Sequence, residues 1–242
     1  MVWRVFLRSF AIQGSWNYRT LQGSGFAYAL MPVLRWVHGS EGDRLQDAVS
    51  RHTTLFNAHP YLSGVVLGAV ARMEADGEDP ALIERFKVAL RGSLGTLGDR
   101  IIWAGWRPAC VLFGLLVLLV THSAGAAVIL FLLIYNSGHL ALRWWGLSIG
   151  LEHGLHVGER LRRAPLTRWH GVVVPAAALL LGAALPLVAD GALTGTRLSA
   201  GWALWPAAAA FVGWRLGSAV RGPAIILLAL IAAAGFLFRI GT

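Results

Sequence analysis

Residues 92 to 108 read Gly-Ser-Leu-Gly-Thr-Leu-Gly-Asp-Arg-Ile-Ile-Trp-Ala-Gly-Trp-Arg-Pro and separate two parts of the chain that differ in composition. The preceding part is polar enough to lie outside a bilayer or at its surface, whereas most of the following part is apolar enough to span one. Glycine recurs at every third position, at Gly92, Gly95 and Gly98. Because glycine weakens a helix and allows close backbone approach, we expect a structural hairpin here, with broken or tightly turned backbone.

A charged stripe follows these glycines, just before Pro108. If residues 99–107 are helical, Asp99, Trp103 and Arg107 are spaced four apart and share one face. A charged face at membrane depth must contact protein or a water-filled cavity, not lipid, so Asp99 and Arg107 would fix the hairpin. Alternatively, the segment is an ordinary interfacial loop in which Asp99 caps a helix and Arg107 reaches the membrane surface.

The composition indicates a membrane protein. Of the 242 residues, 56% are hydrophobic, and the mean hydropathy is +0.61. The net charge is +9, but the arginines lie at the ends of apolar runs, which favours anchoring at an anionic cytoplasmic leaflet over nucleic-acid binding. Eleven tryptophans fit a membrane interface. Cys110 is the single cysteine, which excludes a disulfide or a cysteine metal site within one chain, and we expect no cleaved signal peptide.

The region 1–100 is predicted to be helical and to face the cytosol or the membrane surface, with re-entrant segments. Residues 2–12 form a short basic amphipathic stretch suited to lying in the interface. The apolar stretch that ends at Val37 contains Gly23, Gly25 and Pro32. These residues favour a re-entrant hairpin or interfacial helices over a single straight spanning helix.

Three further helices are predicted in this region. Residues 43–56 and 61–74 have helical periodicity. Asp79 followed by Pro80 is a typical helix start. In the helix that follows, the predicted apolar face (Ile83, Phe86, Leu90) lies opposite a polar face (Glu84, Arg85, Lys87).

The region 101–242 is predicted to be a transmembrane helical region integrated with the first into one membrane domain. Apolar segments lie near 101–121, 124–142, 171–189 and 200–238, the last divided into two by arginines and a proline. This predicts an all-α polytopic membrane protein with about four to five spanning or half-spanning helices. Arginines crowd the loop after the second segment, which places that loop in the cytoplasm (Arg143, Arg160, Arg162, Arg163, Arg168).

Several blocks together resemble the IID membrane component of the mannose/fructose/sorbose class of bacterial sugar phosphotransferase systems. They occur in the family's order over roughly residues 6–155. The blocks are Arg8-Ser9 with Gln13-Gly14-Ser15-Trp16-Asn17-Tyr18; Gln22 with Gly25-Phe26 and Pro32; Arg51-His52 with Phe56-Asn57 and His59-Pro60; Gly92 through Gly98-Asp99 with Trp103 and Arg107-Pro108; and Phe131 to Asn136 with Arg143, Gly146 and Gly150.

The resemblance implies a membrane subunit, without a catalytic group or cofactor of its own, that assembles with a IIC membrane subunit. Together the two would move a hexose-type sugar across the inner membrane. Soluble IIA and IIB phosphocarrier proteins would deliver a phosphoryl group from phosphoenolpyruvate. The family also implies an elevator-type transporter subunit and a higher oligomer of IIC/IID pairs.

A sugar site needs amides and carboxylates for the hydroxyls and an aromatic face for the ring. A competing role for polar residues beside broken helices is to satisfy freed backbone groups. The candidates for the sugar site or translocation path are Gln13, Trp16, Asn17, Gln22, Asn57, His59, Asp99 and Trp103.

Other functions remain as alternatives. Two positions depart from the family pattern, at Arg19 and at residues 100–102, which leaves open a regulatory or scaffolding subunit without sugar flux. Ser137 and His139 raise an intramembrane hydrolase, although residues two apart on a helix point to different faces. Zinc binding by His153 and His156 lacks an evident third ligand, and for His52 and His59 helix-end capping is favoured over phosphorylation.

Overall fold

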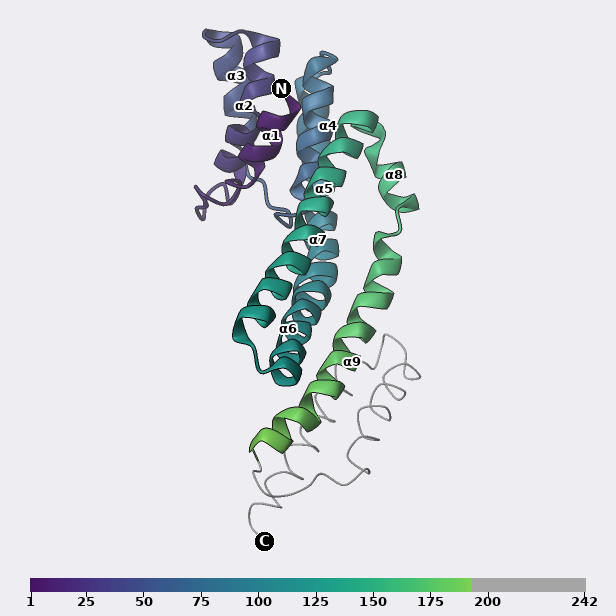
Figure 1. Cartoon of the computed structure of the whole chain (residues 1–242). Helices are drawn as coiled ribbons and strands as arrows, with labels where there is room; N and C mark the ends of the chain where they lie inside the picture. The colour runs from purple at the N-terminus through teal and green to yellow at the C-terminus, as the bar shows by residue number, and fades with distance from the viewer. Residues whose placement is uncertain (193–242) are drawn as a thin grey trace. The chain divides into compact units, whose positions relative to one another are not determined.

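The computed structural model describes residues 1–192, except for the side chains of 167, 170 and 185–192. Every named element in this range is helical, which confirms the all-α prediction there (Figure 1). The predicted apolar segment 200–238 lies outside the described residues. The elements are α1 (Val2–Ser9), α2 (Gly23–His38), α3 (Asp43–His52), α4 (Ser63–Ala75), α5 (Pro80–Gly98), the π-helix η1 (Asp99–Trp106), α6 (Arg107–Thr121), α7 (Ala124–His153), the 3-10 helix η2 (Gly154–His156), α8 (Val157–Arg163) and α9 (Leu166–Ala192).

The chain divides into two compact units whose sequences interleave. Among the described residues, the first contains 1–103 and 135–168, and the second contains 104–134 and 169–192. In the second unit, α6 turns into α7 at His122, whose positive φ of 53° ends α6. The first unit carries α1 to α4, which pack together (Figure 1). The boundary that the sequence suggests near residue 100 remains a prediction.

Four glycines bring α4 and α7 into backbone contact within the first unit. On α4, a Cβ at Gly68 would overlap the carbonyl of Leu147, and one at Gly64 would lie 2.9 Å from the carbonyl oxygen of Arg143. On α7, Gly146 and Gly150 face the α4 backbone in the same way. Both pairs have the small-xxx-small spacing that lets membrane helices approach closely. This contact, the glycine seam, fixes the register of α7 against α4.

The re-entrant hairpin expected in the apolar stretch that ends at Val37 is not formed, because α2 is one helix that contains Pro32. The other expectation for this stretch, interfacial helices in place of a spanning helix, stays a prediction. Gly23 and Gly25 do not break α2. They make room for the carbonyls of Thr54 and Ile12, which a Cβ would overlap. With 16 residues, α2 is shorter than the ~20 that a spanning helix needs.

Pro32 is accommodated by an arginine from α1. Proline has no N–H, so the carbonyl of Tyr28, four residues earlier, loses its helical partner. Nη1 of Arg8 donates to that carbonyl at 3.2 Å, and the guanidinium lies 4.7 Å from the centroid of the Tyr28 ring. The basic amphipathic stretch therefore becomes a helix that both packs on α2 and replaces its missing bond.

The structure agrees with the next three predicted helices in part. Helix α3 begins at the predicted Asp43 but ends at His52 instead of Phe56, and α4 begins at Ser63, two residues after the predicted start. The predicted start of α5 is confirmed. The Asp79 side chain accepts from the N–H of Ala81, and Pro80 opens α5. Ile83 and Phe86 are buried as predicted. Lys87, expected on the polar face, is also buried, because α3 and the segment after it cover that side of α5. Its Nζ donates to the carbonyl of Arg51 and to Thr54, and pairs with Glu84 at 2.9 Å.

The glycine run does not form a hairpin. Helix α5 continues through all three glycines, and the irregularity comes later, as the π-helix η1. A Cβ at Gly92 or Gly95 would meet no atom within 4 Å, so these two positions carry no packing requirement. At Gly98 a Cβ would overlap the His59 side chain. The predicted close approach therefore holds at Gly98, and Arg107-Pro108 begins α6 rather than ending a turn.

Two helices among the described residues are long and apolar enough to cross a membrane, Pro80–Thr121 and Ala124–Arg163, and Gly171–Ala184 is a shorter apolar helix. Only 33% and 11% of the most apolar windows of the two long helices are buried. Core helices of a soluble protein would be mostly buried, so these apolar faces are suited to lipid or a partner subunit.

The glycine seam predicts opposite effects for two similar substitutions. Gly68→Ala should lower the free energy of unfolding by about 2 kcal/mol or more, because the methyl group forces α4 from α7. Gly92→Ala should raise stability by up to about 1 kcal/mol, because alanine is the better helix former in open space. Thermal unfolding in detergent checks both, and equal effects would contradict the seam.

The Arg8 contact predicts coupling with Pro32. Arg8→Met should lower the free energy of unfolding by about 1 kcal/mol, since it leaves the Tyr28 carbonyl without its donor. In a Pro32→Ala background that carbonyl regains a helical N–H, so the same substitution should cost clearly less. A double-mutant cycle of unfolding free energies measures the difference, and an unchanged cost of Arg8→Met would show that the bond does not replace the missing one.

Candidate functional site

An aromatic and polar cluster surrounds Tyr61 in the first unit. The Tyr61 ring stacks on His139 with centroids 4.4 Å apart and meets the His59 ring edge-on at 5.1 Å. Its hydroxyl is 2.6 Å from that of Tyr135. The Trp103 ring lies 5.1 Å from His59. We call these residues, with Arg143, the Tyr61 cluster.

Three separate segments supply the Tyr61 cluster. His59 and Tyr61 lie in the segment that enters α4, and Trp103 is on η1. Tyr135, His139 and Arg143 are spaced four apart on α7 and so share one helix face. The glycine seam sets that face against α4, and Gly98 makes room for His59.

Arg143 is a buried cation, 5% exposed, that makes no ion pair among the described residues. Its Nη1 donates to the carbonyl of Ser9 at 2.9 Å. Ser9 ends α1, where the helix dipole is negative. The guanidinium also lies 4.8 Å from the Phe10 ring centroid and 5.2 Å from that of Tyr61. A carbonyl and two aromatic faces thus take the place of a carboxylate.

The Tyr61 cluster contains three buried nitrogens without a hydrogen-bond partner, Nε2 of His59, Nδ1 of His139 and Nε of Arg143. Nδ1 of His59 accepts from the N–H of Tyr61 at 3.2 Å. Burial, and then the charge of Arg143, lower the pKa of His59 to about 4, so the ring is neutral at pH 7 and carries its proton on Nε2. Polar hydrogens that the fold leaves unpaired in this way suit a hydroxyl-bearing ligand.

The Tyr61 cluster reaches the surface of its unit through Trp103, which is 37% exposed. Tyr61, Tyr135 and His139 are half-buried. Asp99 and Arg107, the other members of the predicted charged stripe, are exposed. The cluster can therefore present one indole face and two phenol hydroxyls to a small polar molecule, whereas the unpaired nitrogens of His59 and His139 are buried.

Two of the N-terminal amides are used within the fold. The buried Gln22 side chain donates to the carbonyl of Ala58 at 2.8 Å and accepts from its N–H at 3.2 Å, which ties the start of α2 to the segment before α4. Asn17 accepts from the N–H groups of Arg19 and Thr20 and closes a loop. Both side chains therefore satisfy backbone groups of this chain, which is the alternative to sugar binding that the sequence analysis gives.

The other N-terminal candidates lie at the surface. Gln13, Trp16 and Asn57 are exposed, and Trp16 packs edge-on against Tyr18 with centroids 4.9 Å apart. The contacts within this chain therefore join only His59 and Trp103, of the eight candidates, to the Tyr61 cluster.

A buried carboxylate, Glu74 on α4, joins three helices of the first unit. Its oxygens lie 2.7 Å from Nε2 of His38, 2.7 Å from Nε2 of His52 and 2.9 Å from Nη2 of Arg51. Burial acts to raise the pKa of Glu74, but the hydrogen bonds from His52, Arg51 and His38 outweigh it and hold the pKa at about 2. Burial lowers the pKa of His52, opposed by its bond to Glu74. His52 therefore supports the core.

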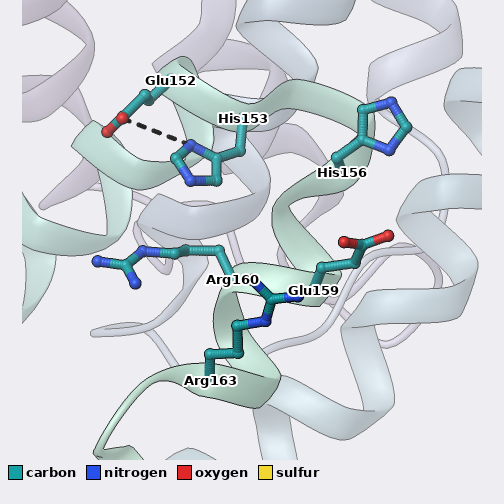
Figure 2. Close-up of a pocket in the computed structure, with 6 residues that line it drawn as sticks. All are labelled: Glu152, His153, His156, Glu159, Arg160 and Arg163. Atoms are coloured by element: carbon teal, nitrogen blue, oxygen red, sulfur yellow. Dashed lines mark ion pairs between the residues drawn. The ribbon is translucent and has the colours of Figure 1, made fainter.

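A pocket of about 330 Å³ lies where α7, η2 and α8 meet (Figure 2). Its lining mixes both signs of charge, and the Glu152 carboxylate is 3.9 Å from Nδ1 of His153. In the part of the chain that the structure describes, no group of three His, Cys, Asp or Glu residues could hold a metal ion. The pocket is lined by Glu152, His153, His156, Glu159, Arg160 and Arg163.

The hydrolase alternative gains no support from the geometry. His139 stacks on Tyr61, whereas Ser137 lies two residues away on α7 and is exposed. Residues two apart on a helix differ by about 200° around its axis, so the serine hydroxyl does not face the imidazole.

Sequence reasoning missed Tyr61, Tyr135 and Glu74. A usable signal existed for the tyrosines, because the chain has only four and both of these lie beside polar residues in apolar surroundings. Glu74 offered a weaker signal, an acid at the end of an apolar helix with two histidines and an arginine earlier in the chain.

The described residues form an all-helical fold with two helices long and apolar enough to cross a membrane, and they bring together a polar aromatic cluster. A family model described as the phosphotransferase system (PTS) mannose/fructose/sorbose family IID component matches residues 1–186. The chain belongs to this family, which confirms the resemblance seen in the sequence. It is thus of the class of membrane subunits found in phosphotransferase sugar transport complexes.

Individual relatives agree with the family. The chain is 32% identical over 158 residues to the mannose-specific IID component of Escherichia coli K12, covering 63% of this chain and 55% of that protein. It is 33% identical over 158 residues to the sorbose-specific component of Klebsiella pneumoniae, with 63% and 57% covered. Against the fructose permease IID component of Bacillus subtilis the identity is 30% over 165 residues, with 66% and 59% covered. The aligned part thus spans just over half the length of these relatives.

Solved structures share the fold. A chain from the mannose transporter ManYZ in complex with microcin E492 superposes with a TM-score of 0.60 at 22% identity, covering 98% of this chain and 95% of that one. A structure described as a membrane protein gives a TM-score of 0.67, again at 22% identity and the same coverage.

The Glu74 contacts predict that acid destabilises the first unit in two steps. The folded pKa of His52 is below its ordinary 6.5, so its contribution is present above pH 6.5 and declines as the pH falls below it. The folded pKa of Glu74 is about 2 against 4.5, so its contribution declines between pH 4.5 and 2. Glu74→Gln should lower the free energy of unfolding by about 3 kcal/mol at pH 7. It should also reduce the loss of stability between pH 4.5 and 2.

Melting temperatures in detergent from pH 8 to 3 measure both steps. Glu78→Gln, the same change four residues along the chain, is the matched control and should behave as the unmodified protein. If Glu74→Gln keeps the full loss of stability below pH 4.5, the acid sensitivity arises elsewhere.

Proposed function

We propose that this chain is the IID subunit of a phosphoenolpyruvate-dependent sugar permease, and that it forms the translocation unit for a hexose-type sugar with a IIC subunit. Its role is to supply one wall of the sugar path and to hold the IIC subunit. The phosphoryl group travels on soluble IIA and IIB proteins, so this chain needs no catalytic residue.

The observation that carries the proposal is the Tyr61 cluster. A pyranose ring presents C–H groups on its faces and hydroxyls at its edges. The half-exposed indole of Trp103 suits the face, and the paired hydroxyls of Tyr61 and Tyr135 suit the edge. Family membership supports the assignment to sugar transport.

We expect the Tyr61 cluster, rather than the N-terminal amides, to form the wall of the sugar path. Gln22 and Asn17 spend their hydrogen bonds inside the fold, so they position the start of α2. Gln13, Trp16 and Asn57 are exposed and suited to contact with the IIC subunit. Asp99 lies one helical turn from Trp103 and is exposed, so it stays a candidate for a sugar hydroxyl.

The proposal includes a bacterial inner-membrane location with the basic loop around α8 in the cytoplasm. The arginines of α8 are exposed, as such a loop requires (Arg160, Arg162, Arg163). Arg143, which the sequence also placed in this loop, is instead buried within α7. We further propose an elevator-type movement and an assembly of several IIC/IID pairs.

The test is phosphoenolpyruvate-dependent uptake of labelled mannose, fructose, galactosamine and sorbose by vesicles that contain this chain, its IIC subunit and the soluble carriers. Trp103→Ala should raise the KM for uptake about tenfold through loss of the ring contact. Tyr135→Phe should raise it about three- to tenfold through loss of one hydroxyl.

Trp16→Ala serves as the comparison, because it removes an exposed indole outside the Tyr61 cluster. If Trp16→Ala raises KM and Trp103→Ala does not, the sugar path lies at the N-terminal residues. A stable complex with IIC that takes up none of the sugars would support the regulatory alternative and overturn the transport proposal.

A further inference from the structure

A second pocket, of about 300 Å³, opens between α1, α2, α4 and α7 in the first unit. Nine of its ten lining residues are apolar, and the tenth is Arg72. Water gains few hydrogen bonds in such a groove, so its apolar walls favour an apolar occupant. The lining residues are Met1, Val2, Val5, Val33, Trp36, Ala71, Arg72, Ala75, Leu147 and Leu151.

One exposed indole, Trp36, lines this groove, and α1 and α7, which also line it, each carry another exposed indole. Trp36 is 65% exposed, and Trp3 on α1 is 59% exposed. Trp3 packs edge-on against Trp144 of α7, which is also exposed. Indoles exposed in this way are typical of the level at which a bilayer meets water. Helix α1 therefore has one face in the protein and another suited to the membrane surface, with the groove beside it.

Positive charge lies at the edge of the groove. Arg72 uses Nε for an exposed pair with Asp76 at 2.6 Å, and its two terminal nitrogens make no hydrogen bond within the described residues. Arg4 on α1 is exposed and makes no ion pair in that part of the chain. Gly154 of η2 packs on the aliphatic part of the Arg72 side chain.

We propose that this groove binds one acyl chain of an anionic phospholipid, with the phosphate held at Arg72. The apolar lining accommodates the hydrocarbon, the indoles lie at the level of the glycerol, and the guanidinium pairs with the phosphate. The lipid fills the gap beside α1 and so stabilises the contact of α1 with α2 and α4. The charge of Arg72 selects anionic over zwitterionic headgroups.

Native mass spectrometry of the full chain, released from vesicles of equal phosphatidylglycerol and phosphatidylcholine content, tests this. The unmodified chain should retain one lipid and prefer phosphatidylglycerol. Arg72→Gln should reduce that preference about fivefold, the effect expected for one basic residue at an anionic surface. Ala75→Trp fills the groove from an exposed position and should abolish retention. Arg44→Gln, an exposed arginine on α3, is the matched charge control and should change nothing.

Equal retention of the two lipids, or retention that survives Ala75→Trp, would overturn the proposal. Melting temperatures of each variant ensure that a loss of binding is not a loss of folding. In the complex with IIC, Ala75→Cys gives a second readout. Cross-linking to a lipid-borne photoprobe supports the lipid, and cross-linking to IIC instead assigns the groove to the partner subunit and overturns the lipid assignment.

Discussion

The approach of two backbones at the glycine seam determines most of what is built around it. Because no side chain separates α4 from α7 at Gly64, Gly68, Gly146 and Gly150, the two helices have one possible register. That register places the α7 face carrying Tyr135, His139 and Arg143 against the segment that leads into α4. Close backbone approach of this kind stabilises a helix pair through dispersion contacts. The candidate sugar site is thus a consequence of helix packing.

The first unit buries two charges and neutralises them in different ways. Glu74 has three nitrogen partners from α2 and α3, which makes it a cross-link between helices. Arg143 has a carbonyl and two ring faces, so its charge is balanced only by partial charges. The Glu74 carboxylate has a nitrogen partner from each of three side chains, which suits a structural role. The arrangement around Arg143 leaves Nε unpaired and suits a site that receives a ligand.

Local signals predicted local structure well. The Asp79-Pro80 start depends on neighbouring residues, and the structure confirms it. The helical periodicity predicted for residues 43–56 is confirmed as far as His52, and the amphipathic stretch 2–12 forms a helix over Val2–Ser9. Predictions failed where a distant residue decided the outcome. Pro32 stays helical because Arg8 reaches it, and Lys87 is buried because α3 covers it. Within the candidate site, His59 and Trp103 were predicted, but Tyr61 and Arg143 owe their roles to the packing of α4 on α7, which no local pattern encodes.

Five long polar side chains in the first unit end on backbone carbonyls that lie far away in sequence. The pairs are Arg8 with Tyr28, Gln22 with Ala58, Lys87 with Arg51, Arg91 with Leu55 and Arg143 with Ser9. Every residue type offers a carbonyl, so the acceptor position is free to vary while the donor is not. Correlated substitution between sites, the usual trace of a tertiary contact, therefore leaves no mark for these pairs, and the part of the fold that they hold can diverge in sequence without losing its shape.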